Sequence, residues 1–158
     1  MIRSVLLVAC LTLVPMAASA QAPKDADLAG CTTKDGQTVC DLYWLRKTVD
    51  AAHTAKAEYG ERDRATGAQL KDLAKSLGKS VAKRDQPADL TFAIAPAPIS
   101  GVDVGPADEE ILELKVYTGE DGQRKLIWVE TYRGQKDRPW PANVHAAIEQ
   151  FRKKLSQS

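Results

Sequence analysis

The chain has 158 residues, of which 22 are basic and 21 acidic, and its formal net charge is +1. This length suits one domain with a real core behind a short leader, and it argues against two domains. A balance this close to neutral, without a long basic run, argues against nucleic acid or an anionic membrane as the main partner.

The first twenty residues have the layout of a secretory signal peptide. Arg3 precedes the apolar run VLLVACLTLVPMA, and the small residues of ASA predict cleavage between Ala20 and Gln21. The apolar run is short for a transmembrane span. Removal of Arg3 with the signal would leave 21 basic and 21 acidic residues. We therefore expect a periplasmic or secreted protein whose mature chain has no transmembrane span.

The segment LVAC, which ends at Cys10, is similar to a bacterial lipobox and offers an alternative. Lipidation of Cys10 would make the protein an outer-membrane lipoprotein. Only about five apolar residues precede this cysteine, fewer than the roughly 7–15 of an export signal, and apolar sequence continues after it. Cleavage after Ala20 is therefore favoured over lipidation. The polar and small residues that follow, 21–30, indicate a flexible leader.

The segment CTTKDGQTVC, residues 31–40, predicts a β-hairpin closed by a disulfide. Asp35-Gly36 is typical of a two-residue turn, because glycine tolerates the positive φ that such turns need. With this pair at the turn, Cys31 faces Cys40 at a non-hydrogen-bonded position, where Cα atoms lie about 4.5 Å apart. The crosslink would contribute about 2–3 kcal/mol. The spacing fits neither a zinc site nor a C-x-x-C redox pair, so we expect a disulfide formed outside the cytoplasm.

The two segments after the hairpin differ in how clearly their structure can be predicted. Residues 41–59 have apolar side chains at helical spacing, yet LYWLRKTV could equally continue a strand out of the hairpin. Residues 64–77 form a single apolar stripe at helical spacing. Asp63 can cap the start of this helix and Gly78 can end it. We expect a helix over 64–77.

Three strands and a helix complete the chain. Residues 88–95 and 110–118 alternate apolar and polar side chains, whereas residues 124–132 are apolar on both faces, which suits a more central strand. The alternation places Trp128 on the inner face of the sheet, in the core. A long proline-rich connection separates the first two strands, and such connections often carry function. The last segment, 142–155, has one apolar face and basic residues at its end, as expected of a helix.

This order of elements predicts an α+β fold. Helices on one face of a mostly antiparallel sheet give a two-layer sandwich, here preceded by the stapled hairpin. We expect a single domain over residues 31–158.

The pattern over residues 64–155 resembles small bacterial envelope domains of unknown function, including lipoprotein-type domains. ADL (88–90) and KLIW (125–128) are the most specific matching segments. The layout is distantly similar to the amino-terminal domain of TolB and to penicillin-binding-protein activator domains. The resemblance implies an α/β sandwich, a periplasmic site, an accessory or assembly role and a strand at about 43–50. It defines no catalytic residues.

The two histidines are the candidates for catalysis or metal binding. His145 and Glu149 have the i,i+4 spacing of two ligands on one helix face, but a third ligand is missing from any readable motif. His53 stands near Glu58 and Asp63 in the sequence, and a general base could be assembled from such groups. We expect no catalytic residue, metal or cofactor. A small periplasmic hydrolase or metal-dependent enzyme using His53 or His145 is the alternative.

The segment DRPWPANV is a candidate contact with a partner. Trp140 lies between two prolines and next to Arg138 along the chain, and Trp and Arg are the residues that binding surfaces favour. The favoured interpretation is nevertheless that Trp140 packs the last helix onto the sheet, because a tryptophan offers a large area to bury. The sequence thus predicts a non-catalytic accessory or binding protein of the bacterial cell envelope, with a protein partner and no nucleic acid.

Overall fold

The computed structural model describes residues 31–34, 37–60, 63–97, 109–119 and 123–157. The elements, in chain order, are β1 (Cys31–Lys34), β2 (Gln37–Cys40), α1 (Leu42–Ala51), β3 (Thr54–Glu58), α2 (Arg64–Ser76), β4 (Ser80–Val81), β5 (Leu90–Pro96), β6 (Glu109–Thr118), β7 (Lys125–Gln135) and α3 (Trp140–Ser156).

Several predictions concern residues outside the described ranges. They are cleavage between Ala20 and Gln21, lipidation at Cys10 and the leader over 21–30. The turn residues Asp35 and Gly36 also lie outside these ranges. All of these stay predictions.

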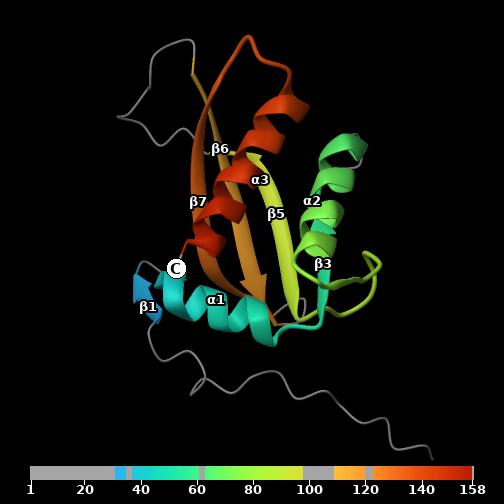
Figure 1. The fold of residues 1–158 in the computed structure, drawn as a ribbon, viewed down its shortest axis with the longest axis vertical. Helices are drawn as coiled ribbons and strands as arrows, with labels where there is room; N and C mark the ends of the chain where they lie inside the picture. Colours follow the sequence, from blue (N-terminus) through green and yellow to red (C-terminus); the bar gives the residue numbers. More distant parts are fainter. Residues whose placement is uncertain (1–30, 35–36, 61–62, 98–108, 120–122, 158) are drawn as a thin grey trace, which may run out of the picture.

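Five strands form one sheet in the order β4-β3-β5-β6-β7. β3 pairs in parallel with β4 and β5, whereas the β5–β6 and β6–β7 pairs are antiparallel. The three helices lie on the same face of this sheet (Figure 1). The predicted α+β two-layer sandwich is confirmed. The sheet is mixed instead of mostly antiparallel, because β3 and β4 add two parallel pairings that the sequence did not predict.

The core fills the space between the helices and the inner face of the sheet. Phe92 of β5 and Phe151 of α3 are fully buried and meet edge to face, with 6.3 Å between their ring centroids. This is one of the arrangements that aromatic pairs prefer. Other fully buried side chains are Leu45, Leu70, Leu73, Leu90, Leu112, Leu114, Val116, Ile127 and Val144. Every helix and each of the three long strands contributes to this set, so one core holds the layers together.

The ambiguous segment 41–59 contains both a helix and a strand. The side chain of Asp41 accepts a hydrogen bond from the backbone N–H of Trp44 and so caps α1. Leu45 and Val49, four residues apart, are the buried residues of this helix. The strand at about 43–50 that the family resemblance implied is therefore wrong. The strand of this segment, β3, begins only after the helix has ended.

The hairpin has the register that the turn argument requires. Cys31 pairs with Cys40 and Lys34 with Gln37 in the two-stranded sheet β1–β2. The hairpin lies against β7, the edge strand of the large sheet (Figure 1). The pairing places the two cysteines opposite one another, and the disulfide between them stays a prediction.

β7 is an edge strand, so the prediction of a central position for residues 124–132 is wrong. A register shift lies at Val116/Tyr117, where Val116 pairs with Trp128 and Tyr117 with Leu126. Ile127 is the extra residue of this bulge and is fully buried. The bulge and the neighbouring hairpin explain why an edge strand carries apolar residues on both faces. Trp128 packs against the core, as predicted.

Asp89 lies in the connection directly before β5, and its side chain is hydrogen-bonded to the start of the neighbouring strand β3. Its Oδ2 accepts hydrogen bonds from the backbone N–H groups of His53 and Thr54, each at 2.8 Å, and from the Thr54 hydroxyl at 3.0 Å. Burial raises the pKa of Asp89, but these hydrogen bonds more than offset it, and the pKa lies below its ordinary value.

We expect Asp89→Ala to lower the free energy of unfolding by about 1–2 kcal/mol at pH 7, because hydrogen bonds to a carboxylate are lost and partial exposure weakens them. A carboxylate with a lowered folded pKa stabilises the protein above its unfolded pKa and loses this contribution as pH falls through the folded value. The difference in the free energy of unfolding between wild type and Asp89→Ala should therefore be constant from about pH 5 to 7 and should become smaller below about pH 4. Urea titrations across this range measure it.

Asp85→Ala is the matched control, since Asp85 is an exposed carboxylate in the same connection. We expect its effect to stay within about 0.5 kcal/mol. An Asp89→Ala effect that is equally small, or that grows on acidification, would contradict the role given to Asp89.

Candidate functional site

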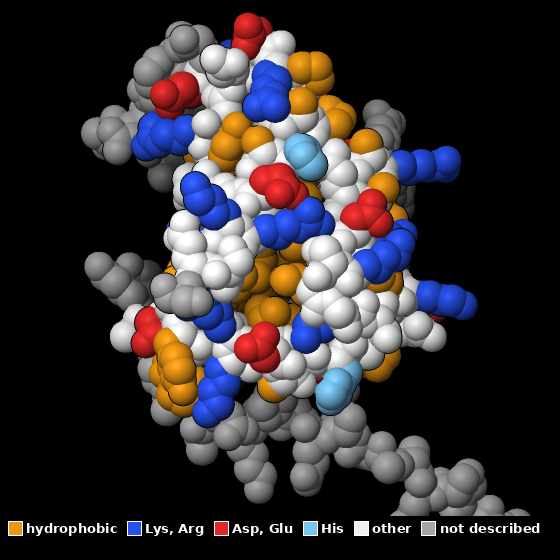
Figure 2. Space-filling model, in the orientation of Figure 1, with side chains coloured by type: hydrophobic (Ala, Val, Ile, Leu, Met, Phe, Trp, Pro, Cys, Tyr) orange, Lys and Arg blue, Asp and Glu red, His pale blue; other side chains and the backbone are white. Residues whose placement is uncertain are grey.

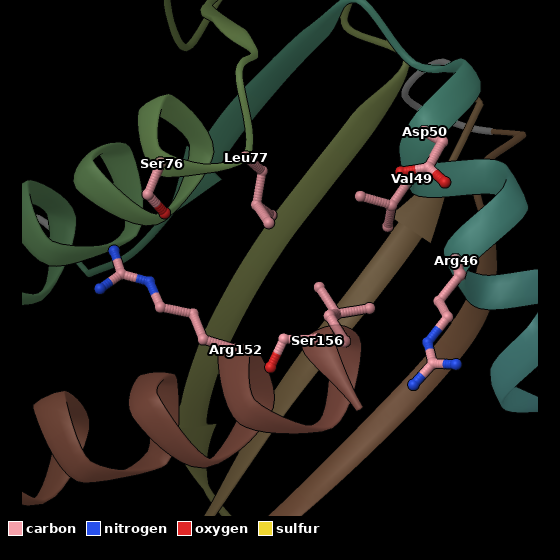
Figure 3. Close-up of a pocket in the computed structure, with 8 residues that line it drawn as sticks. Arg46, Val49, Asp50, Ser76, Leu77, Arg152 and Ser156 are labelled. Atoms are coloured by element: carbon pink, nitrogen blue, oxygen red, sulfur yellow. The ribbon is translucent and has the colours of Figure 1, made fainter. Parts of the chain in front are cut away.

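A hollow of about 420 Å³ opens on the helix face of the molecule, where α1 meets the carboxyl-terminal ends of α2 and α3 (Figure 3). We call it the helix hollow. Figure 2 shows a recess in this face with apolar atoms at its floor and basic side chains around it. The helix hollow is lined by Arg46, Val49, Asp50, Ser76, Leu77, Arg152, Leu155 and Ser156. Its volume lies within the range of small-molecule sites.

Helical periodicity places most of these side chains. Arg46, Val49 and Asp50 stand at positions i, i+3 and i+4 of α1, and α3 repeats the spacing with Arg152, Leu155 and Ser156. Residues at this spacing share one face of a helix. Each of the two helices therefore turns one arginine, one aliphatic residue and one polar residue toward the same space.

The floor of the helix hollow is aliphatic. Val49 is buried, and Leu77 and Leu155 are half-buried and pack against the core. Because these side chains pack against the core, neighbouring residues hold them in position. An apolar group that covered them would gain about 25 cal/mol for each Å² removed from water.

Arg46 lies on one side of the helix hollow and caps α3. Its Nη2 donates to the backbone carbonyl of Lys154 at 2.9 Å, in the last turn of that helix. Its Nε is buried and has no hydrogen-bond partner in the described part of the chain. A buried donor without a partner costs about 1–3 kcal/mol, and because this atom is closed to solvent the cost falls on the folded protein itself.

Arg152 lies on the other side and has a similar unused donor (Figure 3). Its Nη1 contacts the Glu149 carboxylate at 2.5 Å, one helical turn away. Its Nε is also buried, and no partner for it is found among residues 31–34, 37–60, 63–97, 109–119 and 123–157. Two guanidinium groups with unpartnered Nε donors thus border one aliphatic floor.

The electrostatics around the helix hollow are nearly balanced. The carboxyl-terminal ends of α2 and α3 carry partial negative charge, and Asp50 adds a full one. Besides the two arginines, Lys79 lies nearby and donates to the carbonyl of Ala52 at 2.8 Å, at the end of α1.

The structure does not bring the candidate catalytic groups together. His53 precedes β3 and Glu58 ends it, which separates them by about 16 Å along an extended strand. Glu58 pairs with Arg124 at the far end, and Asp63 caps α2. His53 and His145 are both exposed. Within the described ranges, no group of three or more His, Cys, Asp or Glu side chains could hold a metal ion.

Trp140 connects α3 to α2. Its indole Nε1 donates to the Asp63 carboxylate at 2.8 Å and to the Thr66 hydroxyl at 3.0 Å, and its ring is half-buried against the core. Burial raises the pKa of Asp63, but hydrogen bonds from Thr66 and Trp140 outweigh it and lower the pKa. Arg138 is exposed in the preceding turn. A partner contact at Trp140 and Arg138 stays a prediction.

Little in the sequence points to the helix hollow. The periodicity of the last helix predicts its apolar stripe, and the helix dipole alone accounts for Arg152. Arg46 lay in a segment whose structure was ambiguous. The only available signal was the shared spacing of an arginine, an aliphatic residue and a polar residue on the two helices, which is common on helix surfaces.

Comparison with known proteins identifies no family. No family model matches the chain, and no curated protein matches it. Among solved structures, the chain is similar to a “putative lipoprotein” from Caulobacter crescentus, with 11% sequence identity over 70% of this chain and 91% of that chain and a TM-score of 0.34. Similarity to TolB or to penicillin-binding-protein activators stays a prediction. None of the described helices has the length and apolar character needed to cross a membrane.

Proposed function

We propose that this protein is an exported, non-catalytic accessory protein of the bacterial cell envelope that binds a partner through the helix hollow. The signal-peptide layout before Gln21 and the facing cysteines of the hairpin support export. The nearly neutral charge fits a protein partner better than a nucleic acid.

One observation carries the choice of the helix hollow as the binding site. It combines an aliphatic floor with two half-buried arginines, Arg46 and Arg152, one on each side (Figure 3). Binding sites typically combine an apolar surface with a few polar groups that fix orientation.

A capture experiment from envelope extract tests this function. Ser156→Trp would fill the helix hollow from its exposed rim, and Gln157→Trp adds the same side chain one residue away, outside the lining. We expect wild type and Gln157→Trp to enrich the same partner and Ser156→Trp to lose it. Identical capture by all three proteins would remove the helix hollow as the contact, and enrichment of nothing by the wild type would remove the function.

Intact-mass measurement of the protein recovered from the periplasm tests export and the disulfide. We expect a chain that begins at Gln21, carries no lipid and is about two mass units lighter than its reduced form, because one disulfide joins Cys31 and Cys40. Reduction followed by alkylation should then label two sulfurs. Labelling of both sulfurs without reduction, or a chain that begins at a lipidated Cys10, would contradict this prediction.

A further inference from the structure

We infer that the β1–β2 hairpin covers a dimerisation edge. When the hairpin moves away, the first half of β7 pairs antiparallel with β7 of a second copy of this chain. This surface is separate from the helix hollow, so the inference does not depend on the proposed function. It rests on the different ways in which the two edges of the large sheet are protected.

The two edges of the large sheet differ in length. One edge is β4, a strand of two residues, and the other is β7, a strand of 11 residues. An edge strand presents unpaired backbone N–H and C=O groups, and a short edge strand offers few of them. β7 is therefore the edge at which a further strand could pair.

The first half of β7 has the composition of a segment that pairs with other strands. The residues LIWV (126–129) follow one another and contain neither a charge nor a proline. Aliphatic and aromatic side chains of this kind favour strands, and such segments associate when their edge is open. The next residue, Glu130, is buried on the inner face and paired with Lys154, so it places no charge on the edge. Since charge and proline are missing here, this edge needs a cover.

The hairpin supplies that cover. β2 lies against β7, and the hairpin is beside the lower half of this strand in Figure 1, where β7 begins. Among the described strands, β2 pairs with β1 and is not a member of the large sheet. Leu45 and Val49 hold the following helix, α1, in the core. The hairpin can therefore leave the edge while the domain stays folded.

The strand lengths point to a second copy of the chain as the occupant and limit the assembly to a dimer. Two copies of one strand pair antiparallel about a two-fold axis, and each supplies the backbone groups that the other lacks. This pairing uses the β7 edge of both copies and joins their five-stranded sheets. The edges that remain are the two β4 strands, which are too short to continue the sheet.

Sedimentation velocity of the mature protein tests the inference. Thr32 and Val39 face each other at a hydrogen-bonded position of the hairpin. The double variant Thr32→Pro/Val39→Pro removes both backbone donors of this pair and should open the hairpin. We expect the variant to dimerise with a dissociation constant of about 10–100 μM, as suits a small interface, and the wild type to associate at least about tenfold more weakly.

Amide hydrogen exchange at low protein concentration provides a second readout. In monomers of the double variant, the amides of residues 126–130 should exchange faster than in the wild type, because the cover has left the edge. Raising the protein concentration should restore their protection in the variant, because the second copy then pairs with the same edge.

Two charge variants separate the edge of the sheet from its outer face. Val129 lies opposite Lys115 and Ile111 lies opposite Arg133, all on the face away from the helices. Val129→Glu and Ile111→Glu each gain a cross-strand partner of opposite charge, so both monomers should fold. In the double-proline background, Val129→Glu should abolish dimerisation, because it brings like charges of two edge strands together. Ile111→Glu lies on the interior strand β6 and should leave the dimer unchanged.

The outcomes that would overturn the inference are distinct. Unchanged exchange in the double variant would show that the hairpin does not cover the edge, and fast exchange in a protein that stays monomeric would show that the open edge does not pair. Equal loss of the dimer with Val129→Glu and Ile111→Glu would show that the outer face forms the contact. Asp89→Ala is the control for reduced stability, and a dimer of equal affinity in this variant would remove the hairpin as the cause.

Discussion

Lys154→Met is expected to lower the free energy of unfolding by about 2 kcal/mol, although Lys154 is partly exposed. The reason lies in its partner, Glu130, which is 3% exposed on the inner face of β7. Lys154 Nζ contacts both carboxylate oxygens, at 2.8 and 3.0 Å. Removing one member of a fully buried ion pair destabilises a protein by about 3–5 kcal/mol, because the other charge is left buried without compensation. Since Lys154 is partly exposed, we expect a smaller loss here.

The remaining ligands of Glu130 explain why the protein should still fold. Trp128 Nε1 donates to one oxygen at 3.1 Å and Gln150 Nε2 to the other at 2.6 Å. These hydrogen bonds stabilise the carboxylate but do not neutralise it. Methionine keeps most of the aliphatic part of the Lys154 side chain, so the loss of stability measures the removal of the charge and not a change in packing.

A double-mutant cycle isolates the pair. Glu130→Gln leaves Lys154 able to reach water and should cost about 1 kcal/mol, less than Lys154→Met. The combined variant removes both charges, keeps an acceptor for Trp128, and should be more stable than the sum of the single effects predicts by about 1 kcal/mol or more. Lys153→Met is the surface control. Additive single effects in urea unfolding followed by circular dichroism would show that the pair is not coupled.

Local signals sufficed where a segment's structure is set by its own residues. The α2 helix begins at residue 64 because Asp63 accepts a hydrogen bond from the backbone N–H of Thr66 at 3.0 Å. Gly78 follows it with a φ of 73°, which glycine adopts without a steric penalty. The hairpin register followed from Asp35-Gly36 in the same way. Each of these features is decided within a few residues.

Sequence patterns failed where distant segments decide the structure. β3 reads TAKAE, and alanine, lysine and glutamate favour helices over strands. The segment is a strand because it lies between β4 and β5 in the sheet, where Ala55 and Ala57 are buried. Its position, not its composition, supplies the stabilisation. No periodicity in five residues could have shown this.

The helix hollow was missed for a related reason. Its lining comes from the first and last helices of the described chain and from the end of α2. Arg46 and Arg152 are unremarkable as single residues, since exposed arginines on helices are common. Their buried Nε atoms become visible only when the three helices are packed together. A site built from three separated segments leaves no local motif.

Gly134→Ala is expected to lower the free energy of unfolding by about 2–3 kcal/mol, although replacing glycine by alanine in a strand usually stabilises it by about 0.5–1 kcal/mol. A Cβ atom on Gly134 would lie 2.7 Å from Cγ and Oδ1 of Asn143. Asn143 is fully buried, and its Nδ2 donates to Glu110 at 2.7 Å and to the carbonyl of Gln135 at 2.8 Å. The side chain cannot move away without losing both hydrogen bonds.

The Asn143→Ala background shows whether this contact is the cause. Asn143→Ala alone should cost about 1–3 kcal/mol, because the Glu110 carboxylate and the Gln135 carbonyl lose their donor. Once the amide is gone, the added methyl group has room, so Gly134→Ala should then be neutral or stabilising by up to about 1 kcal/mol. Thermal and urea unfolding of the four proteins measure the coupling. The same cost for Gly134→Ala in both backgrounds would mean that backbone strain at position 134, and not its close approach to Asn143, requires glycine there.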